Sequence, residues 1–475
     1  MNILSTSFAV VFIVFYILYW LLRNNLRIHN LFVLLVSYVF YSLIDWRFGG
    51  LLLFTSLSVY CTGLYFENVK ETIYRKIGLI SAIAINIGIL FFFKYYNFFA
   101  GEFAQLLGIN QDKVLLNLIL PVGISFYTFT SLGYAIDVYQ RKVKATKDVI
   151  SVLSFITFFP LILSGPIERS DGLLVQFKKK RVFDYHLSTD GITQVVWGAF
   201  KKLVIADNIA VIVNNAFGNY ENLPASSLII GAFLYTFQIY FDFSGYSDIA
   251  IGISKLLGFK VRRNFHYPYF ALNVADFWKR WHMSLQSWLM NYIYFPLGGS
   301  RCSKGRIVLN TLIVFTICGI WHGANWTFIV WGVYHGLLFI PLILFCSKEF
   351  RKTTVNEDRM LPSIKETGLM LFTFVLVTIG WILFNASSLG VGMGYIAGMF
   401  NLSVLSTPVG IGLTDAYYIF ALLIITLMFE WSQRSKEHPF QFQSSGWIKV
   451  ILLYVLVGHI IFCNAAQSDF IYYQF

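Results

Sequence analysis

The sequence predicts an all-α polytopic membrane protein with roughly 11 to 13 membrane segments. Of its 475 residues, 57% are hydrophobic and 13% are charged, and the mean hydropathy is +0.65. Such a chain carries more apolar surface than a water-soluble fold can bury. A spanning helix needs about 20 mostly apolar residues, and such stretches recur from Ser7–Leu22 to Lys449–Cys463. Since internal repeats and long linkers are not apparent, we expect residues 1–475 to form a single integral membrane domain.

The first four apolar segments lie near 7–22, 29–44, 51–66 and 78–100, and short polar connectors join them. They are expected to cross the membrane in alternating directions. The first segment has neither a basic leader nor a small-residue cleavage site, so it should be a retained span and not a removed signal peptide.

The net charge of +12 comes from Lys and Arg residues in the connectors, which is typical of cytoplasmic loops and not of a nucleic-acid surface. Counting spans back from these loops places the N-terminus outside. From composition we therefore expect the protein to contact membrane lipid and not to bind nucleic acid. The basic groups expected in the cytoplasm are Arg23 and Arg27, Arg141/Lys142/Lys144/Lys147, Lys178–Arg181, Arg262/Arg263 and Arg301/Arg306.

The stretch Ile150–Gly165 differs from an ordinary span, because basic loops flank both of its ends and Phe159–Pro160 and Ser164–Pro166 interrupt it. If both flanks are cytoplasmic, the stretch enters and leaves the membrane on one side. Broken backbone at membrane depth persists only inside protein or beside a wet cavity. The sequence therefore predicts a re-entrant segment that lines a central cavity.

The segment Phe277–Leu289 is predicted to be one amphipathic helix at the membrane boundary. Trp278, Trp281, Leu285 and Trp288 recur at helical spacing, and polar residues occupy another face. Beyond it, residues 310–346 are expected to form two spans hinged at Gly319–Asn325. The last spans are expected near 367–384, 412–431 and 449–463.

The apolar segment Phe237–Gly252 carries a polar stripe formed by Gln238, Asp242 and Tyr246 at a spacing of four, with Ser244 and Asp248 beside it. Such a face must point inward, because ionisable groups are costly in lipid. We favour a structural interpretation over direct chemistry, with the stripe bonding helices together or pairing with a cation such as Arg280.

His322 is the sharpest candidate for chemistry, because apolar residues and glycines surround it in Cys318–Trp326. Burial disfavours the charged imidazolium, so the ring should stay neutral and able to accept a proton. A neutral base at this depth could deprotonate a hydroxyl that attacks a thioester. From the residues alone, a hydrogen-bonding or proton-path role for this histidine is as well supported.

Two further histidines follow aromatic residues. His282 shares its predicted helical face with Lys279 and Gln286, which favours substrate positioning, with a second catalytic role as the alternative. His335 is expected to be a packing residue. The eight histidines form no HExxH pattern and the five cysteines no CxxC pair, so we expect no metal site.

Several motifs together closely resemble the membrane-bound O-acyltransferase family, and within it the branch of alginate O-acetyltransferases. The family motifs are Tyr240–Asp248, Asn264–Phe265, Pro268–Tyr269, Phe277–Leu285, Pro296–Arg301 and Trp321–Ala324. The branch features are Pro121–Tyr127, Asp137–Tyr139, Phe159–Pro160, Gly165–Ile167 and Phe470–Phe475.

This resemblance implies tilted helices around a central funnel, with the family's invariant histidine, here His322, at the constriction and His282 as its second histidine. The donor would be acetyl-CoA or another acyl thioester, with no bound cofactor. An extracytoplasmic acetyltransferase partner protein would then acetylate an exported polysaccharide from a bacterial cytoplasmic membrane. The candidate substrate-binding residues in the motifs are Asp242, Tyr246, Asp248, Arg280, Trp321 and Asn325.

The sequence departs from the resemblance at two positions. Lys279 and Asn385 stand where arginine is expected. Lysine keeps the positive charge of arginine, whereas asparagine is neutral. Two other functions stay open. One is a D-alanyl transferase of cell-wall polymers that uses a carrier protein. The other is a transporter or channel whose path uses the intramembrane Asp and His residues.

Overall fold

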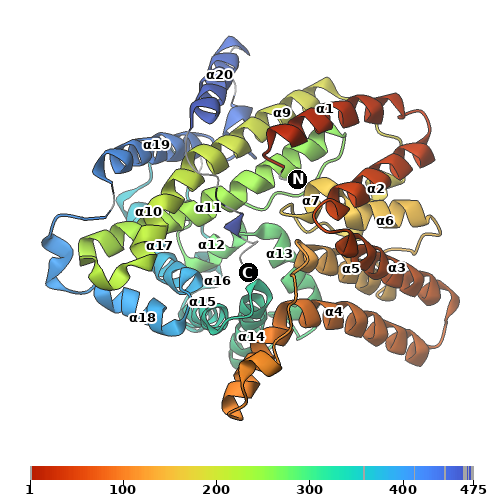
Figure 1. Ribbon diagram of the computed structural model, residues 1–475, viewed down its shortest axis with the longest axis horizontal. Coiled ribbons are helices and arrows are strands. Elements are labelled where there is room, and N and C mark those ends of the chain that lie inside the picture. The colour runs from red at the N-terminus through yellow and green to blue at the C-terminus, as the bar shows by residue number, and fades with distance from the viewer. Residues whose placement is uncertain are drawn as a thin grey trace. The chain divides into compact units, whose positions relative to one another are not determined.

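The computed structural model describes residues 3–356, 359–410, 412–442, 446–463, 468 and 470–471. These residues form α-helices joined by short 3-10 and π-helical turns and contain no strand, so the predicted all-α class is confirmed (Figure 1). Six helices are long and apolar enough to cross a membrane: α3 (Trp46–Asn68), α4 (Thr72–Leu106), α11 (Ala225–Leu256), α14 (Lys304–His322), α15 (Trp326–Leu344) and α17 (Ile364–Asn385).

Shorter apolar helices account for the remaining predicted segments. With these six, the described residues contain twelve apolar helical stretches, of which six are long enough to cross a membrane. The shorter stretches are α1 (Thr6–Leu21), α2 (Leu26–Ser42), Val149–Ile162, α18 (Leu389–Gly398), α19 (Leu413–Ser432) and α20 (Gly446–Phe462).

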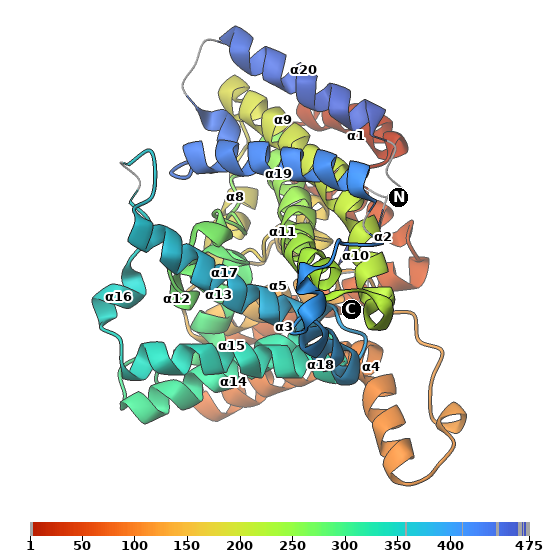
Figure 2. The same ribbon diagram turned by 90° about the vertical axis from the view of Figure 1, so that its left-hand side faces the viewer.

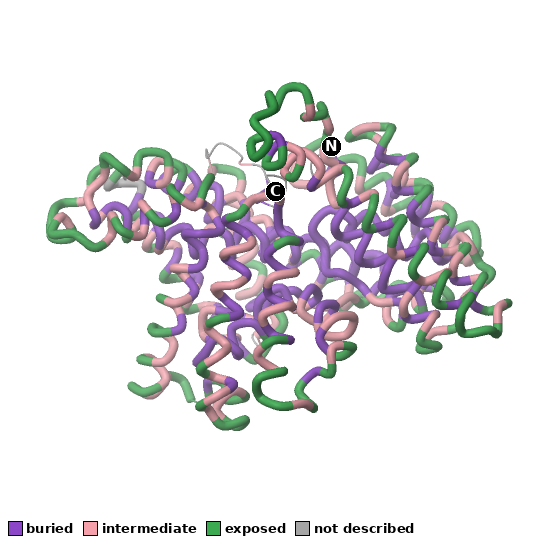
Figure 3. Tube along the Cα trace, turned by 90° about the horizontal axis from the view of Figure 1, so that it is seen from below, coloured by how far each residue is buried: buried purple, intermediate pink, exposed green. Residues whose placement is uncertain are grey.

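Many helices carry exposed residues on one side and buried residues on the other (Figure 3). In α1 the exposed side consists of apolar residues such as Val10, Ile13 and Ile17, each more than half exposed. An apolar outer side is what a helix that contacts lipid requires. The protein is therefore a multi-pass membrane protein.

The helices form two compact units. The first comprises Met1–Ile192 and Ala250–Arg262, and the second comprises Thr193–Ile249 and Arg263–Phe475. A single domain over residues 1–475 remains a prediction.

In the first unit, α3 packs against α2, α4, α5 (Ile124–Tyr139) and α6 (Val149–Thr157) (Figure 1). Side-chain caps set where these helices begin, because Asn25, Asp45 and Asp148 each accept a backbone N–H of the first turn. The buried helix α5 was not among the predicted spans.

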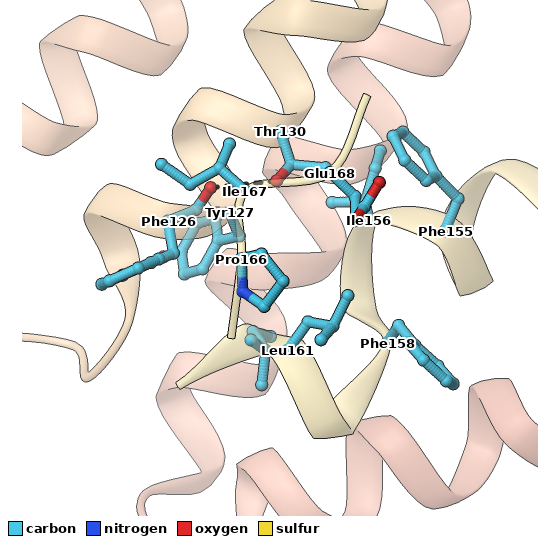
Figure 4. Close-up of a pocket in the computed structure, with 11 residues that line it drawn as sticks. Phe126, Tyr127, Thr130, Phe155, Ile156, Phe158, Leu161, Pro166, Ile167 and Glu168 are labelled. Atoms are coloured by element: carbon cyan, nitrogen blue, oxygen red, sulfur yellow. Dashed lines mark hydrogen bonds between the residues drawn. The ribbon is translucent and has the colours of Figure 1, made fainter. Parts of the chain in front are cut away.

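The predicted interruption of Ile150–Gly165 is present. Helix α6 ends at Thr157 and the short α7 (Phe159–Ile162) follows, with Pro160 in its first turn. The two helices line a small pocket together with α5 and the segment Pro166–Glu168 (Figure 4). Broken backbone therefore lies beside this small pocket. Whether the segment is re-entrant and the cavity central stays a prediction.

In the second unit, α14 and α15 form an antiparallel hairpin whose bend lies at Gly323–Asn325, as predicted (Figure 2). Two glycines bring the helices into backbone contact. A Cβ on Gly319 would lie 2.3 Å from the Phe328 carbonyl oxygen, and one on Gly332 would lie 2.3 Å from that of Phe315. Helix α17 packs against α15 and completes this group.

The predicted boundary helix Phe277–Leu289 is wrong in two respects. The segment is broken into α12 (Val274–Arg280) and α13 (Met283–Leu289). It is also buried, since Trp278, Trp281 and Trp288 are at most 6% exposed. The tryptophans contact α14, α15 and α17 instead of a membrane surface: Trp278 lies against Phe315 and Trp331, and Trp281 against Trp381.

Candidate active site

His322 is the last residue of α14 and is 3% exposed. The chain turns directly after it, through Gly323, where an added Cβ would lie 2.3 Å from the Phe328 ring. Helix α15 begins at Trp326, with the Asn325 side chain accepting the N–H of Thr327. The hairpin thus places the imidazole at a helix end, where the backbone turns back on itself.

Aromatic rings enclose the His322 imidazole. The ring centroids of Trp321, Trp331 and Phe384 lie 4.9, 5.0 and 5.1 Å from it, each in an edge-on arrangement. These rings come from α14, α15 and α17, so three helices must pack correctly to form the enclosure. Aromatic walls exclude water and strengthen electrostatic interactions inside them.

His282 lies at the break between α12 and α13, in the left-handed conformation with φ 44° and ψ 51°. This conformation is uncommon for residues other than glycine, although histidine adopts it more often than most. It turns the His282 side chain into the interior, where it is 1% exposed. The predicted common face with Lys279 does not exist, because Lys279 is exposed.

A neighbouring segment bonds the backbone at this break. The His266 N–H donates to the Arg280 carbonyl at 3.0 Å, and the Met283 N–H donates to the Asn264 carbonyl at 2.8 Å. The Ser284 hydroxyl also donates to the Asn264 side chain at 2.6 Å. The motif Asn264–Phe265 therefore supports the break that orients His282.

Trp321 contacts both histidines. Its ring centroid is 5.8 Å from that of His282 and 4.9 Å from that of His322. Phe243 of α11 contacts His282 from another side at 4.7 Å. The structure thus brings together His322, His282 and Trp321, three of the predicted site residues. Burial lowers the pKa of His282 to about 3, so this ring is neutral at physiological pH.

The polar stripe of α11 is occupied by ion pairs. The Lys202 ammonium lies 2.6 Å from the Asp242 carboxylate and 2.7 Å from that of Asp207. The Lys201 ammonium lies 2.6 Å from the Asp248 carboxylate. These ion pairs agree with the structural interpretation of the stripe, and a direct role in chemistry stays a prediction.

The suggested cation was wrong, however. Arg280 pairs with Asp276 at 2.9 Å, one turn earlier in α12, and both carboxylates of the stripe are paired with lysines.

The other predicted residues have structural contacts. Tyr246 is 2% exposed and packs on the Phe470 ring at 4.5 Å. Asn325, besides capping α15, donates to the Ser387 carbonyl at 3.0 Å. Whether Asp242, Tyr246, Asp248, Arg280 or Asn325 contacts a substrate stays a prediction. Among the described residues, no group of three or more His, Cys, Asp or Glu side chains is arranged to hold a metal ion.

Comparison with known proteins places this arrangement in a family. The sequence model of the membrane-bound O-acyltransferase family matches residues 142–387, which include both histidines and α11. A protein named probable alginate O-acetylase from Pseudomonas putida is 34% identical over 500 residues, covering 99% of each chain. The chain belongs to the membrane-bound O-acyltransferase family.

Two other relatives of this acyltransferase carry different names. A peptidoglycan O-acetyltransferase from Helicobacter pylori is 29% identical over 491 residues, covering 94% of this chain and 91% of the relative. A teichoic acid D-alanyltransferase from Bacillus subtilis is 31% identical over 286 residues, covering 57% of this chain and 69% of the relative. All three names denote transfer of an acyl group.

Sequence reasoning missed the two lysines of this membrane-bound O-acyltransferase that pair with α11. Lys201 and Lys202 lie in a π-helical turn, Phe200–Ala206, between α9 (Tyr185–Ala199) and α10 (Asp207–Gly218). Both are buried, at 2% and 0% exposure. The available signal was two adjacent lysines inside the apolar run Val195–Ala206, since a buried lysine requires an acidic partner.

Lys202 also bonds the C-terminal segment of the acyltransferase. Its ammonium donates to the carbonyl and hydroxyl of Ser468, each at 3.0 Å, and Asp242 accepts the Ile471 N–H at 2.9 Å. Burial lowers the pKa of Lys202, but the carboxylates of Asp242 and Asp207 outweigh it and raise that pKa above its usual value. The ammonium is therefore charged and, together with Asp242, holds Ser468 and Ile471 beside α11.

Proposed function

We propose that this protein is a membrane O-acetyltransferase in which His322 acts on the acyl group of a thioester. The observation that carries the proposal is the buried His322 imidazole, enclosed by Trp321, Trp331 and Phe384 at the bend between two apolar helices. The names of the alginate and peptidoglycan relatives support acetyl as the transferred group.

In the proposed step, His322 accepts the proton of an attacking hydroxyl as its oxygen forms a bond to the thioester carbonyl carbon. The carbon–sulfur bond then breaks, and the proton passes to the departing thiolate. An alternative step has the imidazole nitrogen take the acetyl group first and pass it to the hydroxyl. Both steps require a neutral imidazole, which apolar burial favours.

His282 is proposed as the second histidine of the same reaction. It shares the Trp321 ring with His322, and burial keeps it neutral. A neutral imidazole can donate one hydrogen bond and accept another. This suits it to orient the attacking hydroxyl or the thioester carbonyl.

The donor is proposed to be acetyl-CoA or another acetyl thioester that enters from the cytoplasmic side. Basic residues such as exposed Lys178–Lys180 would favour an anionic donor there. The acetyl group would then reach an extracytoplasmic acetyltransferase partner, which completes the O-acetylation of an exported polysaccharide. Because the relatives above come from bacteria, we place the protein in a bacterial cytoplasmic membrane.

Thiol release by the purified full-length protein in lipid nanodiscs tests the donor. We expect acetyl-CoA to be consumed by the native protein and His322→Ala to lower the rate at least about a hundredfold, the scale of general-base catalysis. The matched control is His186→Ala, since His186 is an exposed histidine of α9. Equal rates for the native protein and His322→Ala would contradict the role of His322.

A D-alanyl transferase is the second candidate, because the teichoic acid relative matches 57% of this chain at 31% identity. It is less well supported, since the acetyl-transferring relatives extend over more than nine-tenths of the chain. Consumption of a D-alanyl carrier-protein thioester in place of acetyl-CoA would favour it. Family membership supports either transferase over a transporter or channel.

A further inference from the structure

We propose that His335 is a positioning residue that fixes the aromatic wall of the His322 site through a hydrogen bond with Trp278. This inference rests on the proposed function, because it gives His335 a role in the reaction assigned to His322. His335 lies in α15, is fully buried, and is separated from Trp278 by 57 residues in sequence.

The Trp278 indole Nε1 donates to His335 Nδ1 at 3.3 Å, with the two rings 5.0 Å apart and nearly perpendicular. An indole N–H can only donate, so Nδ1 must be the accepting nitrogen and the proton of a neutral ring must lie on Nε2. If His335 were protonated, its Nδ1–H would face the Trp278 indole N–H, and the hydrogen bond would be lost. The bond therefore selects one tautomer of a neutral imidazole.

This pair reaches His322 through a single ring. Trp331 lies 5.1 Å from His335 and 5.0 Å from His322, and it is itself fully buried. Trp278 also contacts Trp331 at 5.7 Å. The Trp331 ring thus packs against the Trp278–His335 pair and also against the His322 imidazole.

Helix α17 leaves space for this arrangement at Gly380. A Cβ on that residue would lie 2.6 Å from His335 Nε2. The ring could not then keep its place without moving Trp278 or Trp331. Gly368 of the same helix has no atom within 4 Å of its Cβ position, so the crowding is specific to Gly380.

Two tryptophans, Trp278 of α12 and Trp331 of α15, and Gly380 of α17 therefore fix His335. His335 itself is packed behind Trp331, which is the ring that contacts both histidines. Its loss should disturb the orientation of His322, which sets kcat, and leave donor binding unchanged.

The test compares His335→Leu with His335→Asn in nanodiscs, with acetyl-CoA as the probe and thiol release as the readout. The Asn carbonyl can replace Nδ1 as acceptor, whereas Leu cannot. We expect His335→Leu to lower kcat about tenfold, the equivalent of one buried hydrogen bond of about 1.4 kcal/mol. KM should not change, and His335→Asn should recover most of the rate.

Trp278→Phe provides a second route that leaves His335 in place. It removes the N–H donor and part of the ring, so it should lower kcat at least as much as His335→Leu. Combining the two should cause less loss than the sum of the single effects. Gly380→Ala should act in the same direction, whereas Gly368→Ala should leave kcat unchanged. Equal losses for His335→Asn and His335→Leu would overturn the hydrogen-bond argument.

The outcomes separate this inference from the function on which it rests. Native kcat in both His335→Leu and Trp278→Phe, with His322→Ala inactive, would overturn the positioning role alone. Full activity of His322→Ala would instead overturn the proposed function. A rise in KM without a fall in kcat would also contradict positioning, because it would assign the pair to donor binding.

Discussion

The left-handed backbone of His282 is the residue-scale feature on which the candidate site depends. Positive φ at a residue with a side chain costs of order 1–3 kcal/mol and is kept where the surroundings determine it. Here Asn264 and His266 bond the backbone on both sides of the break. The conformation lies directly before the first turn of α13 and places the imidazole against Trp321.

Burial of His282 predicts that acid destabilises the protein. The folded-state pKa is about 3, against 6.5 for the ordinary residue. Between these values the unfolded chain binds a proton that the folded protein excludes, so stability is lost as the pH falls below 6.5. At pH 5.5 this group alone should cost about 1.4 kcal/mol.

Thermal unfolding in detergent, measured from pH 7.5 to 5.5, tests this prediction. His282→Asn should remove part of the acid sensitivity, because asparagine also tolerates the left-handed conformation but does not titrate. An unchanged pH dependence in that variant would show that His282 does not contribute to it.

At this scale the sequence predicted the site only in part. His322 was identified because histidines in apolar sequence are rare and costly. His282 was identified from its Trp–His pair and from the family resemblance. The lysines of the polar stripe were not identified, since Lys201 and Lys202 are adjacent in sequence and a regular helix would point them in different directions. The π-helical turn lets both reach α11, and sequence periodicity does not reveal such a turn.

At the scale of elements, a glycine pair lets α9 and α11 approach closely. A Cβ on Gly198 would lie 2.5 Å from the Gly245 carbonyl oxygen, and one on Gly245 would lie 2.8 Å from that of Gly198. Small residues at such helix crossings let the two backbones touch. Close packing of this kind stabilises helix pairs in a membrane, where the hydrophobic effect does not drive helices together. This contact brings Lys201 within reach of Asp248.

Gly198→Ala should therefore destabilise the protein by about 1–3 kcal/mol, the usual cost of overpacking, although alanine favours a helix more than glycine does. Thermal denaturation in detergent measures the effect. The matched control is Gly218→Ala in α10, where a Cβ has no neighbour within 4 Å. Equal melting temperatures for both variants would contradict close packing at Gly198.

Element boundaries were predictable where glycine, proline or a capping residue marks them. The bend of the α14–α15 hairpin and the break before α7 were both found in this way. The division of α12 from α13 was not, because Phe277–Leu289 contains neither glycine nor proline and keeps helical spacing throughout. Tertiary bonds from Asn264 and His266 create that break.

At the scale of the whole molecule, composition sufficed for the all-α membrane class, since 57% hydrophobic residues cannot be buried in a water-soluble fold of this size. It did not reveal the helical stretch from α9 to α10, whose buried charges interrupt the apolar pattern. Those charges are tolerated only because partners from α11 and Ser468 neutralise or bond them.

The distribution of basic loops predicts the orientation of the protein. A cysteine at exposed Lys179 should react with a membrane-impermeant maleimide only from the cytoplasmic side. A cysteine at Ile44, between α2 and α3, should react from the outside. Both belong in a background where exposed Cys61 is replaced by serine. Labelling of Lys179→Cys in intact cells would reverse the proposed orientation.

The acetyl-ester content of the exported polymer tests the central claim most directly. It should be measured in cells whose sole copy carries His322→Ala or the control His186→Ala, each present in the membrane at the native amount. We predict loss of acetyl esters with His322→Ala and native content with His186→Ala. Native acetylation in the His322→Ala strain would contradict a catalytic role for this histidine.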